Sequence, residues 1–196
     1  MLLIWKRIIR RIIQIYSRPD AGWNEETLES LAEQYRRIAR FYVACFAAGE
    51  PFTFPLFEEK IRMRLSGRCA ECRLGYRQPS VSPDGHLYPC VQFLDQPDYA
   101  IGDVFNGLDE NARRRIHRCS EEPVKSCEGC AIADRCRHHC ACLNFQKTGD
   151  LSLVSPDQCL HERLLIPIAD EAAAKLYTMQ SSIFLHRFYE PDHALI

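Results

Sequence analysis

The residues with the clearest chemical potential in this chain are its cysteines, which number 11 among 196 residues. Residues 1–68 hold one of them, residues 69–159 hold ten, and residues 160–196 hold none. The clustered thiols include two spaced motifs, Cys69-x2-Cys72 and Cys127-x2-Cys130-x5-Cys136-x3-Cys140. A Cys-x2-Cys turn directs two thiolates at one metal centre, as zinc and iron–sulfur sites both require. The middle of the chain is therefore predicted to bind metal through thiolates.

The context of the cysteines argues against a disulfide framework. Their number is odd, and the apolar run of residues 1–16 is broken by Lys6, Arg7, Arg10 and Arg11 with no small-residue cleavage site after it. No secretory signal is therefore expected. In the cytoplasm thiols stay reduced, and clustered cysteines there are metal ligands more often than disulfide partners. The sequence predicts a cytoplasmic metal-binding protein.

Composition and charge exclude several functions. Lys and Arg total 25 against 26 for Asp and Glu, so a general nucleic-acid binder is not expected. No apolar run reaches the roughly 18 residues of a membrane-spanning helix. No Ser/His/Asp arrangement or phosphate-binding loop is present, and we assign no catalytic residue. The basic helix expected near the N-terminus is predicted to pack on protein, with a membrane surface as the alternative.

The elements that must position the cysteines can be read from periodicity and turn residues. Apolar spacing predicts a helix over residues 5–16, another from an Asn24 cap to Gly49, and others over 56–65, 108–117 and 169–179. Residues 80–90 are predicted to form a β-hairpin that turns at Pro83, Asp84 and Gly85. A strand-like piece is expected over 99–105, and the aromatic end after residue 179 is expected to be loosely ordered.

The cysteine array as a whole resembles the SPASM domain, the auxiliary domain of many radical S-adenosylmethionine enzymes that modify peptides. That pattern has a Cys before a Gly-x4-Cys element, then Cys-x2-Cys-x5-Cys-x3-Cys, then a last Cys. Here Gly85 and Cys90 form the second element, with 15 residues between Cys69 and Gly85 and 12 between Cys72 and Gly85, and Cys159 closes the pattern. The resemblance covers residues 69–159.

The resemblance implies two 4Fe–4S clusters, with the last cysteine of the run crossing to the first cluster. The first cluster would take Cys69, Cys72, Cys90 and Cys140. The second would take Cys127, Cys130, Cys136 and Cys159. The implied fold is a small α+β protein, with N-terminal helices before a cysteine-rich domain that has a β-hairpin, short helices and two cluster-stapled loops. Its expected domains are a helical arm at 1–68, an iron–sulfur domain at 69–160 and a C-terminal helix and tail at 161–196.

The implied function is to serve a radical enzyme by relaying electrons or engaging its peptide substrate. The Cys-x3-Cys-x2-Cys motif that would bind S-adenosylmethionine is missing, and a full (β/α) barrel takes about 200 residues or more. The chain alone is therefore not expected to be an enzyme. Its expected partners are a radical S-adenosylmethionine domain or protein, a peptide or protein substrate, and an electron donor such as a ferredoxin or flavodoxin. It is either part of a longer enzyme or a stand-alone protein.

Alternatives remain for the ligands and for the cysteines outside the pattern. Zinc, pairing Cys69-x2-Cys72 with Cys127-x2-Cys130 in an interaction module without redox activity, is the alternative cofactor. Cys45 is interpreted as a buried apolar residue on a helix. Cys119 and Cys142 fall outside the pattern, with Cys142 as an alternative, substitute ligand. His138, His139, Arg135 and Arg137 are interpreted as hydrogen-bond donors near the sulfurs or as solvated charges.

Overall fold

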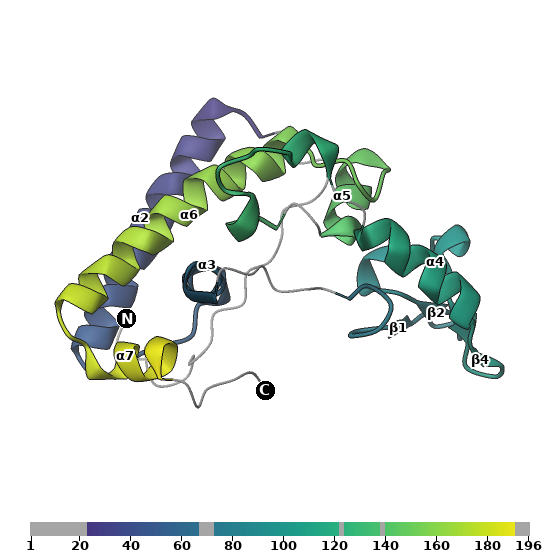
Figure 1. Cartoon of the computed structure of the whole chain (residues 1–196), viewed down its shortest axis with the longest axis horizontal. Coiled ribbons are helices and arrows are strands. Elements are labelled where there is room, and N and C mark those ends of the chain that lie inside the picture. The colour runs from purple at the N-terminus through teal and green to yellow at the C-terminus, as the bar shows by residue number, and fades with distance from the viewer. Residues whose placement is uncertain (1–22, 67–72, 122–123, 138–139, 191–196) are drawn as a thin grey trace. The chain divides into compact units, whose positions relative to one another are not determined.

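The computed structural model describes residues 23–66, 73–121, 124–137 and 140–190 (Figure 1). The expected helix over 5–16 and the pair Cys69 and Cys72 lie outside these residues. Of the described residues, 62% are helical, and these residues also form two small antiparallel hairpins, which agrees with a small α+β protein. It divides into two compact units: Met1–Arg68 with Leu160–Ile196, here the helical unit, and Cys69–Cys159, here the cysteine-rich unit. Whether the three expected segments are separate domains stays a prediction.

The first described helix, α2 (Glu25–Ala47), begins where the sequence predicts it. The Asn24 side chain accepts a hydrogen bond from the Thr27 amide, and the Thr27 hydroxyl accepts one from the Asn24 amide, both at 2.9 Å. This capping box satisfies two amides that have no partner inside the helix. The chain leaves the helix at Gly49, whose φ of 74° favours glycine. Both expected ends of this helix are confirmed.

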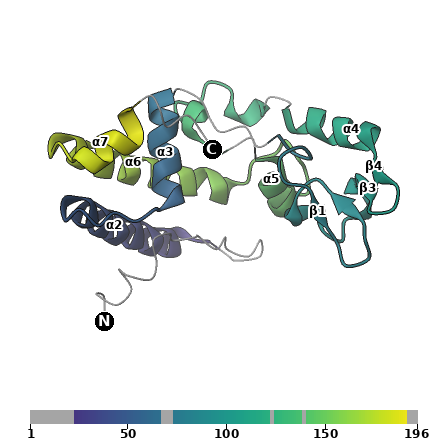
Figure 2. The same cartoon turned by 90° about the horizontal axis from the view of Figure 1, so that it is seen from below.

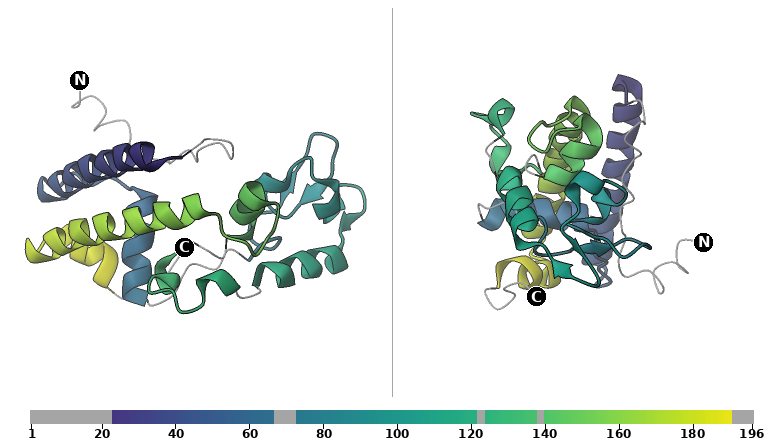
Figure 3. Two further views of the ribbon diagram at one scale, coloured as in Figure 1. Left: turned by 90° about the horizontal axis from the view of Figure 1, so that it is seen from above. Right: turned by 90° about the vertical axis from the view of Figure 1, so that its right-hand side faces the viewer.

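Three more helices complete the helical unit: α3 (Pro55–Ser66), α6 (Pro156–Thr178) and α7 (Ser182–Tyr189). α2 and α6 run side by side, and α3 crosses them (Figures 2 and 3). α6 is longer than the predicted helix over 169–179. The expectation of a loosely ordered end is wrong for residues 182–189, because Ser181 caps α7 and Phe184 is fully buried in the core of the unit. Burial of aromatic side chains thus stabilises a segment whose helical signal is weak.

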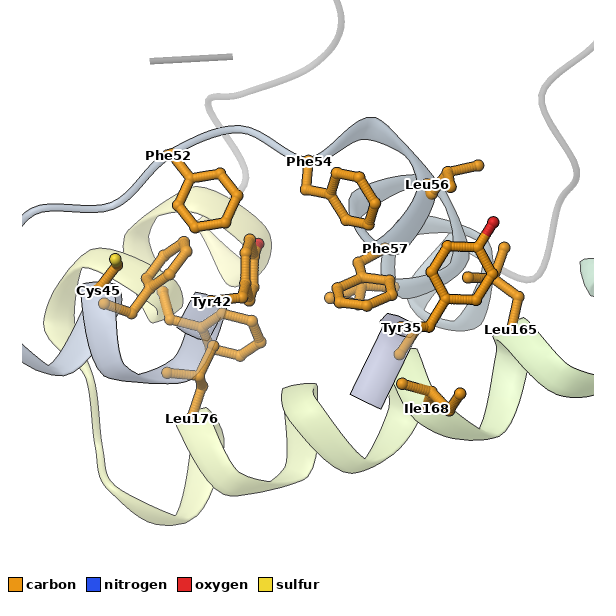
Figure 4. Close-up of a cluster of buried hydrophobic side chains, with 14 residues drawn as sticks. Tyr35, Tyr42, Cys45, Phe52, Phe54, Leu56, Phe57, Leu165, Ile168 and Leu176 are labelled. Carbon is orange, nitrogen blue, oxygen red and sulfur yellow. The ribbon is translucent and has the colours of Figure 1, made fainter. Parts of the chain in front are cut away.

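The core of the helical unit is rich in aromatic rings (Figure 4). The ring of Tyr42 lies 4.7 Å from that of Phe46, 5.4 Å from Phe52 and 5.9 Å from Phe57, measured between centroids. The last two pairs meet edge to face, which is the arrangement aromatic quadrupoles prefer. Cys45 is buried at the edge of this cluster, as the sequence predicts. It acts there as a small apolar side chain.

Two buried ion pairs also hold the helical unit together. Lys60 of α3 is fully buried, and its Nζ lies 2.6 Å from Oε2 of Glu162 on α6. Arg187 of α7 lies 2.9 Å from Oε1 of Glu58, which is also buried. Buried charges are tolerated only when they are paired. These contacts therefore specify how α3, α6 and α7 pack.

The cysteine-rich unit contains two short hairpins. β1 (Ser80–Val81) pairs with β2 (Leu87–Tyr88), and the turn between them uses Pro83, Asp84 and Gly85 as predicted. β3 (Gly102–Asp103) pairs with β4 (Gly107–Leu108), so the expected strand over 99–105 is only two residues long. Gly102 has a φ of 131°, and a Cβ there would collide with the carbonyl oxygen of Gly107. Only glycine fits at this close approach.

Short helices cover the rest of the cysteine-rich unit. They are η1 (Val91–Phe93), η2 (Pro97–Tyr99), α4 (Glu110–Glu121), η3 (Lys125–Cys127), η4 (Ala133–Arg135) and α5 (Ala141–Thr148). α4 overlaps the predicted helix over 108–117, whereas α5 was not predicted. The rings of Phe93, Tyr99 and Phe145 pack against one another with centroids 4.6–5.2 Å apart and join α5 to η1. This aromatic contact brings together the two segments that carry Cys90 and Cys140.

Candidate metal centre

Cysteines from two distant segments meet where α5 packs against η1. Cys90 caps the N-terminus of η1, and Cys140 occupies the same position on α5. The Sγ atoms of Cys140 and Cys142 are 3.3 Å apart. Cys142 also forms a hydrogen bond with Cys90. The three thiols Cys90, Cys140 and Cys142 are called the first thiol group below.

The hydrogen bonds within the first thiol group shift the pKa values of its members in opposite directions. The hydrogen bond from Cys142 lowers the pKa of Cys90 to about 6, and the backbone amides of Gln92 and Val91 act in the same direction against the effect of burial. The Cys142 hydrogen bond likewise lowers the pKa of Cys140 to about 6. The same two hydrogen bonds, together with burial, raise the pKa of Cys142. These pKa shifts favour the thiolate form of Cys90 and Cys140, which is the form that binds metal, and the thiol form of Cys142.

A second set of cysteines lies around η3, η4 and the start of α6. The amide of Cys130 donates to the carbonyl of Cys127 at 3.1 Å, which closes the Cys-x2-Cys turn. Burial raises the pKa of Cys127, a hydrogen bond from Ser126 opposes this, and the charges of Cys130 and Cys159 raise the pKa further. Cys159 thus lies close enough to the turn to act on it electrostatically. Cys136 follows η4 and is buried.

A polar contact inside the cysteine-rich unit joins the start of α6 to the loop before α5. Nε2 of Gln158 donates to the carbonyl oxygen of Arg137 at 2.9 Å. Gln158 immediately precedes Cys159, and Arg137 immediately follows Cys136. This hydrogen bond therefore brings the backbone beside Cys159 close to the backbone beside Cys136.

The structure leaves part of the predicted ligand set undescribed. Cys69 and Cys72 lie outside the described residues, as do His138 and His139. Within the described ranges, no three His, Cys, Asp or Glu residues form a group arranged to hold a metal ion. The assignment of the eight cysteines to two clusters, and the two cluster-stapled loops, stay predictions.

The observed neighbours do not favour the zinc alternative. That alternative joins Cys127 and Cys130 to another Cys-x2-Cys pair and leaves Cys159 out. The structure instead puts Cys159 within electrostatic range of Cys127. Cys90, which the zinc pairing also omits, has a pKa lowered to about 6, mainly by its hydrogen bond with Cys142. The zinc pairing gives neither Cys90 nor Cys159 a role.

Sequence reasoning did not foresee the place of Cys142. The cysteine pattern has no position for it, yet its side chain contacts Cys140 and Cys90. The available signal was the Cys-x-Cys spacing of Cys140 and Cys142 at the start of a helix. Cys119, which also lies outside the pattern, is on α4. The pKa of Tyr99 is raised by burial first, then by the charges of Asp150 and Asp98, and last by the electrostatic effect of Cys119.

Comparisons with known proteins give a structural likeness. No family model and no curated protein matches the chain. The structure of hexahistidine-tagged anSMEcpe with bound AdoMet matches with a TM-score of 0.59 and 17% identity over 87% of this chain and 51% of that chain. Native anSMEcpe with bound AdoMet and the Kp18Cys peptide matches with a TM-score of 0.53 and 12% identity over 87% and 47%.

The likeness concerns the fold, because identity at this level does not carry residue roles. The chain spans about half the length of the anSMEcpe structures it matches. The fold of this chain therefore resembles part of the fold of these anSMEcpe structures. No described helix is long and apolar enough to cross a membrane.

Proposed function

We propose that this chain is a SPASM-type module that binds two 4Fe–4S clusters and serves a radical S-adenosylmethionine enzyme acting on a peptide or protein. The observation that carries this proposal is which cysteines lie next to Cys140. Cys140 is the last cysteine of the Cys127–Cys140 run. Cys142 nevertheless contacts both Cys140 and Cys90, so Cys140 lies near the segment that follows the hairpin. The electrostatic effect on Cys127 comes instead from Cys130 and Cys159. This split is the one expected if the last cysteine of the run serves the other cluster.

The proposed ligands are Cys69, Cys72, Cys90 and Cys140 for the first cluster and Cys127, Cys130, Cys136 and Cys159 for the second. The low pKa of Cys90 and Cys140 supports the first set, because thiolates and not thiols bind iron. Each set has four thiolates, one for each iron. Clusters held in this way supply one-electron transfer and leave no open position for substrate. The function proposed for them is electron relay.

The proposed partners carry out the steps that fully ligated clusters cannot perform. A domain that binds S-adenosylmethionine, on the same longer chain or on another, would carry out the reaction, and a small electron-transfer protein of the ferredoxin or flavodoxin type would supply electrons. The fold likeness to anSMEcpe with bound AdoMet supports the first partner. The likeness to anSMEcpe with a bound peptide supports a role in peptide engagement. Both roles rest on analogy of fold.

Metal analysis tests the proposal directly. The full chain, purified and reconstituted without oxygen, should contain about eight iron and eight sulfide ions and give electron paramagnetic resonance signals of reduced 4Fe–4S clusters. Stoichiometric zinc without sulfide would instead identify a zinc module and end the proposal.

A matched pair of variants tests the ligand sets. Cys136→Ala should lose about half of the iron, because one cluster loses a ligand. Cys45→Ala should keep all of it, because Cys45 lies in the aromatic core of the helical unit. Equal losses from both variants would refute the ligand assignment.

A further inference from the structure

Cys142 is the one cysteine that contacts two proposed ligands without belonging to the family pattern. Its side chain is 8% exposed and belongs to the apolar cluster of the cysteine-rich unit, with Phe93, Ile101 and Ile116. It lies in the first turn of α5, two residues after Cys140. Its position is therefore set by the packing of the helix and not by a mobile loop.

The distance between the sulfur atoms argues against Cys142 as another ligand. Thiolates bound to different irons of one 4Fe–4S cluster are farther apart than two thiolates on a single metal ion, because each sulfur lies outside its own corner of the cube. The Sγ atoms of Cys140 and Cys142 are 3.3 Å apart, which is the contact distance of an S–H···S hydrogen bond. Even a tetrahedral zinc would hold its sulfurs farther apart, at about 3.8 Å, from a Zn–S bond of about 2.3 Å.

The direction of the hydrogen bonds follows from the chemistry of ligation. Cys90 and Cys140 carry no hydrogen once they bind iron as thiolates. The hydrogen in either contact must then belong to Cys142. Its single S–H serves both neighbours in turn, since it contacts both. The apolar surroundings strengthen this hydrogen bond, because little water competes for the sulfurs.

We propose that Cys142 is a hydrogen-bond donor to the thiolates of Cys90 and Cys140 and that it raises the reduction potential of the cluster they bind. This inference rests on the proposed function. A donor to a ligand sulfur stabilises the extra negative charge of the reduced cluster more than that of the oxidised one. Cys142 is thus a positioning and tuning residue and not a ligand.

Three variants of the full chain test this role after reconstitution without oxygen. Cys142→Ala should keep the iron and sulfide content of the unaltered chain, while the midpoint potential of one cluster falls and that of the other does not change. Cys142→Ser should restore most of the shift, because a hydroxyl also donates. Cys119→Ala, on α4 and outside the thiol groups, is the matched control and should leave both potentials unchanged. The measurement is a redox titration followed by electron paramagnetic resonance.

The different failures are distinguishable. If Cys142→Ala loses as much iron as Cys140→Ala does, Cys142 is a ligand and the inference is overturned. If iron is retained and neither potential falls, its hydrogen bond has no role in tuning and the inference is also overturned, while the proposed function stands. If the unaltered chain itself contains no iron and sulfide, the proposed function fails and the inference fails with it.

Discussion

The buried pair of Lys60 and Glu162 gives the sharpest stability prediction for the helical unit. The two side chains are 0% and 4% exposed, and their charged atoms are 2.6 Å apart. At an effective dielectric constant of about 20, this separation corresponds to a gross attraction of about 6 kcal/mol. Removing both ions from water costs several kcal/mol for each of them. The pair as a whole therefore contributes little, but either ion left alone is costly.

Single and double replacements separate these two effects. We expect Lys60→Met or Glu162→Leu alone to lower the free energy of unfolding of the helical unit by about 3–5 kcal/mol. The double variant should be close to the unaltered chain or more stable by about 1–4 kcal/mol, since no buried charge is left. Urea unfolding can be followed by tryptophan fluorescence, because both tryptophans, Trp5 and Trp23, belong to the segment Met1–Arg68.

A second ion pair between the same two helices provides the control. Arg64 of α3 and Asp170 of α6 are 3.1 Å apart, and their side chains are 59% and 22% exposed. Water screens such a pair, so Arg64→Met should cost no more than about 1 kcal/mol. A cost for Lys60→Met no greater than that for Arg64→Met would refute the reasoning, as would a double variant no more stable than either single one.

Three further predictions concern one local feature each. Alkylation of the metal-free chain at Cys90 should reach half its maximal rate near pH 6. At Cys127 the half-maximal rate should be reached at a higher pH than for an ordinary thiol. The reason is that the thiolate is the nucleophile and the two pKa values are shifted in opposite directions. Mass spectrometry of the labelled peptides measures this, and equal midpoints would contradict it. Gly102→Ala should destabilise the cysteine-rich unit by more than the roughly 1–2 kcal/mol of an ordinary left-handed residue, because a Cβ there meets backbone, whereas Gly149→Ala meets open space. Limited proteolysis compares the two, and equal cleavage rates would refute the close approach. Asn24→Ala should lower the free energy of unfolding by about 1 kcal/mol through loss of the cap, with Asn24→Asp nearly neutral in a thermal melt.

The predictions that succeeded rest on signals within a few residues. The start of α2 depends on Asn24 and Thr27, and the hairpin of β1 and β2 depends on the turn at residues 83–85. In both places short-range geometry is sufficient to specify the backbone. The prediction of a loosely ordered segment at α7 was wrong for the opposite reason. Ser182–Tyr189 is stabilised by the burial of Phe184 against residues far away in the chain. No local pattern reports that burial.

The cysteines show the same division between local and long-range information. Their spacing by itself predicted a thiolate metal site and gave the resemblance that names eight candidate ligands. Spacing limits which thiols can reach one centre from one turn, and this is a property of the chain alone. The contact of Cys142 with Cys90 depends on how α5 packs against η1, through the rings of Phe93 and Phe145. Only the tertiary structure could decide it, because packing and not spacing brings those two sulfurs together.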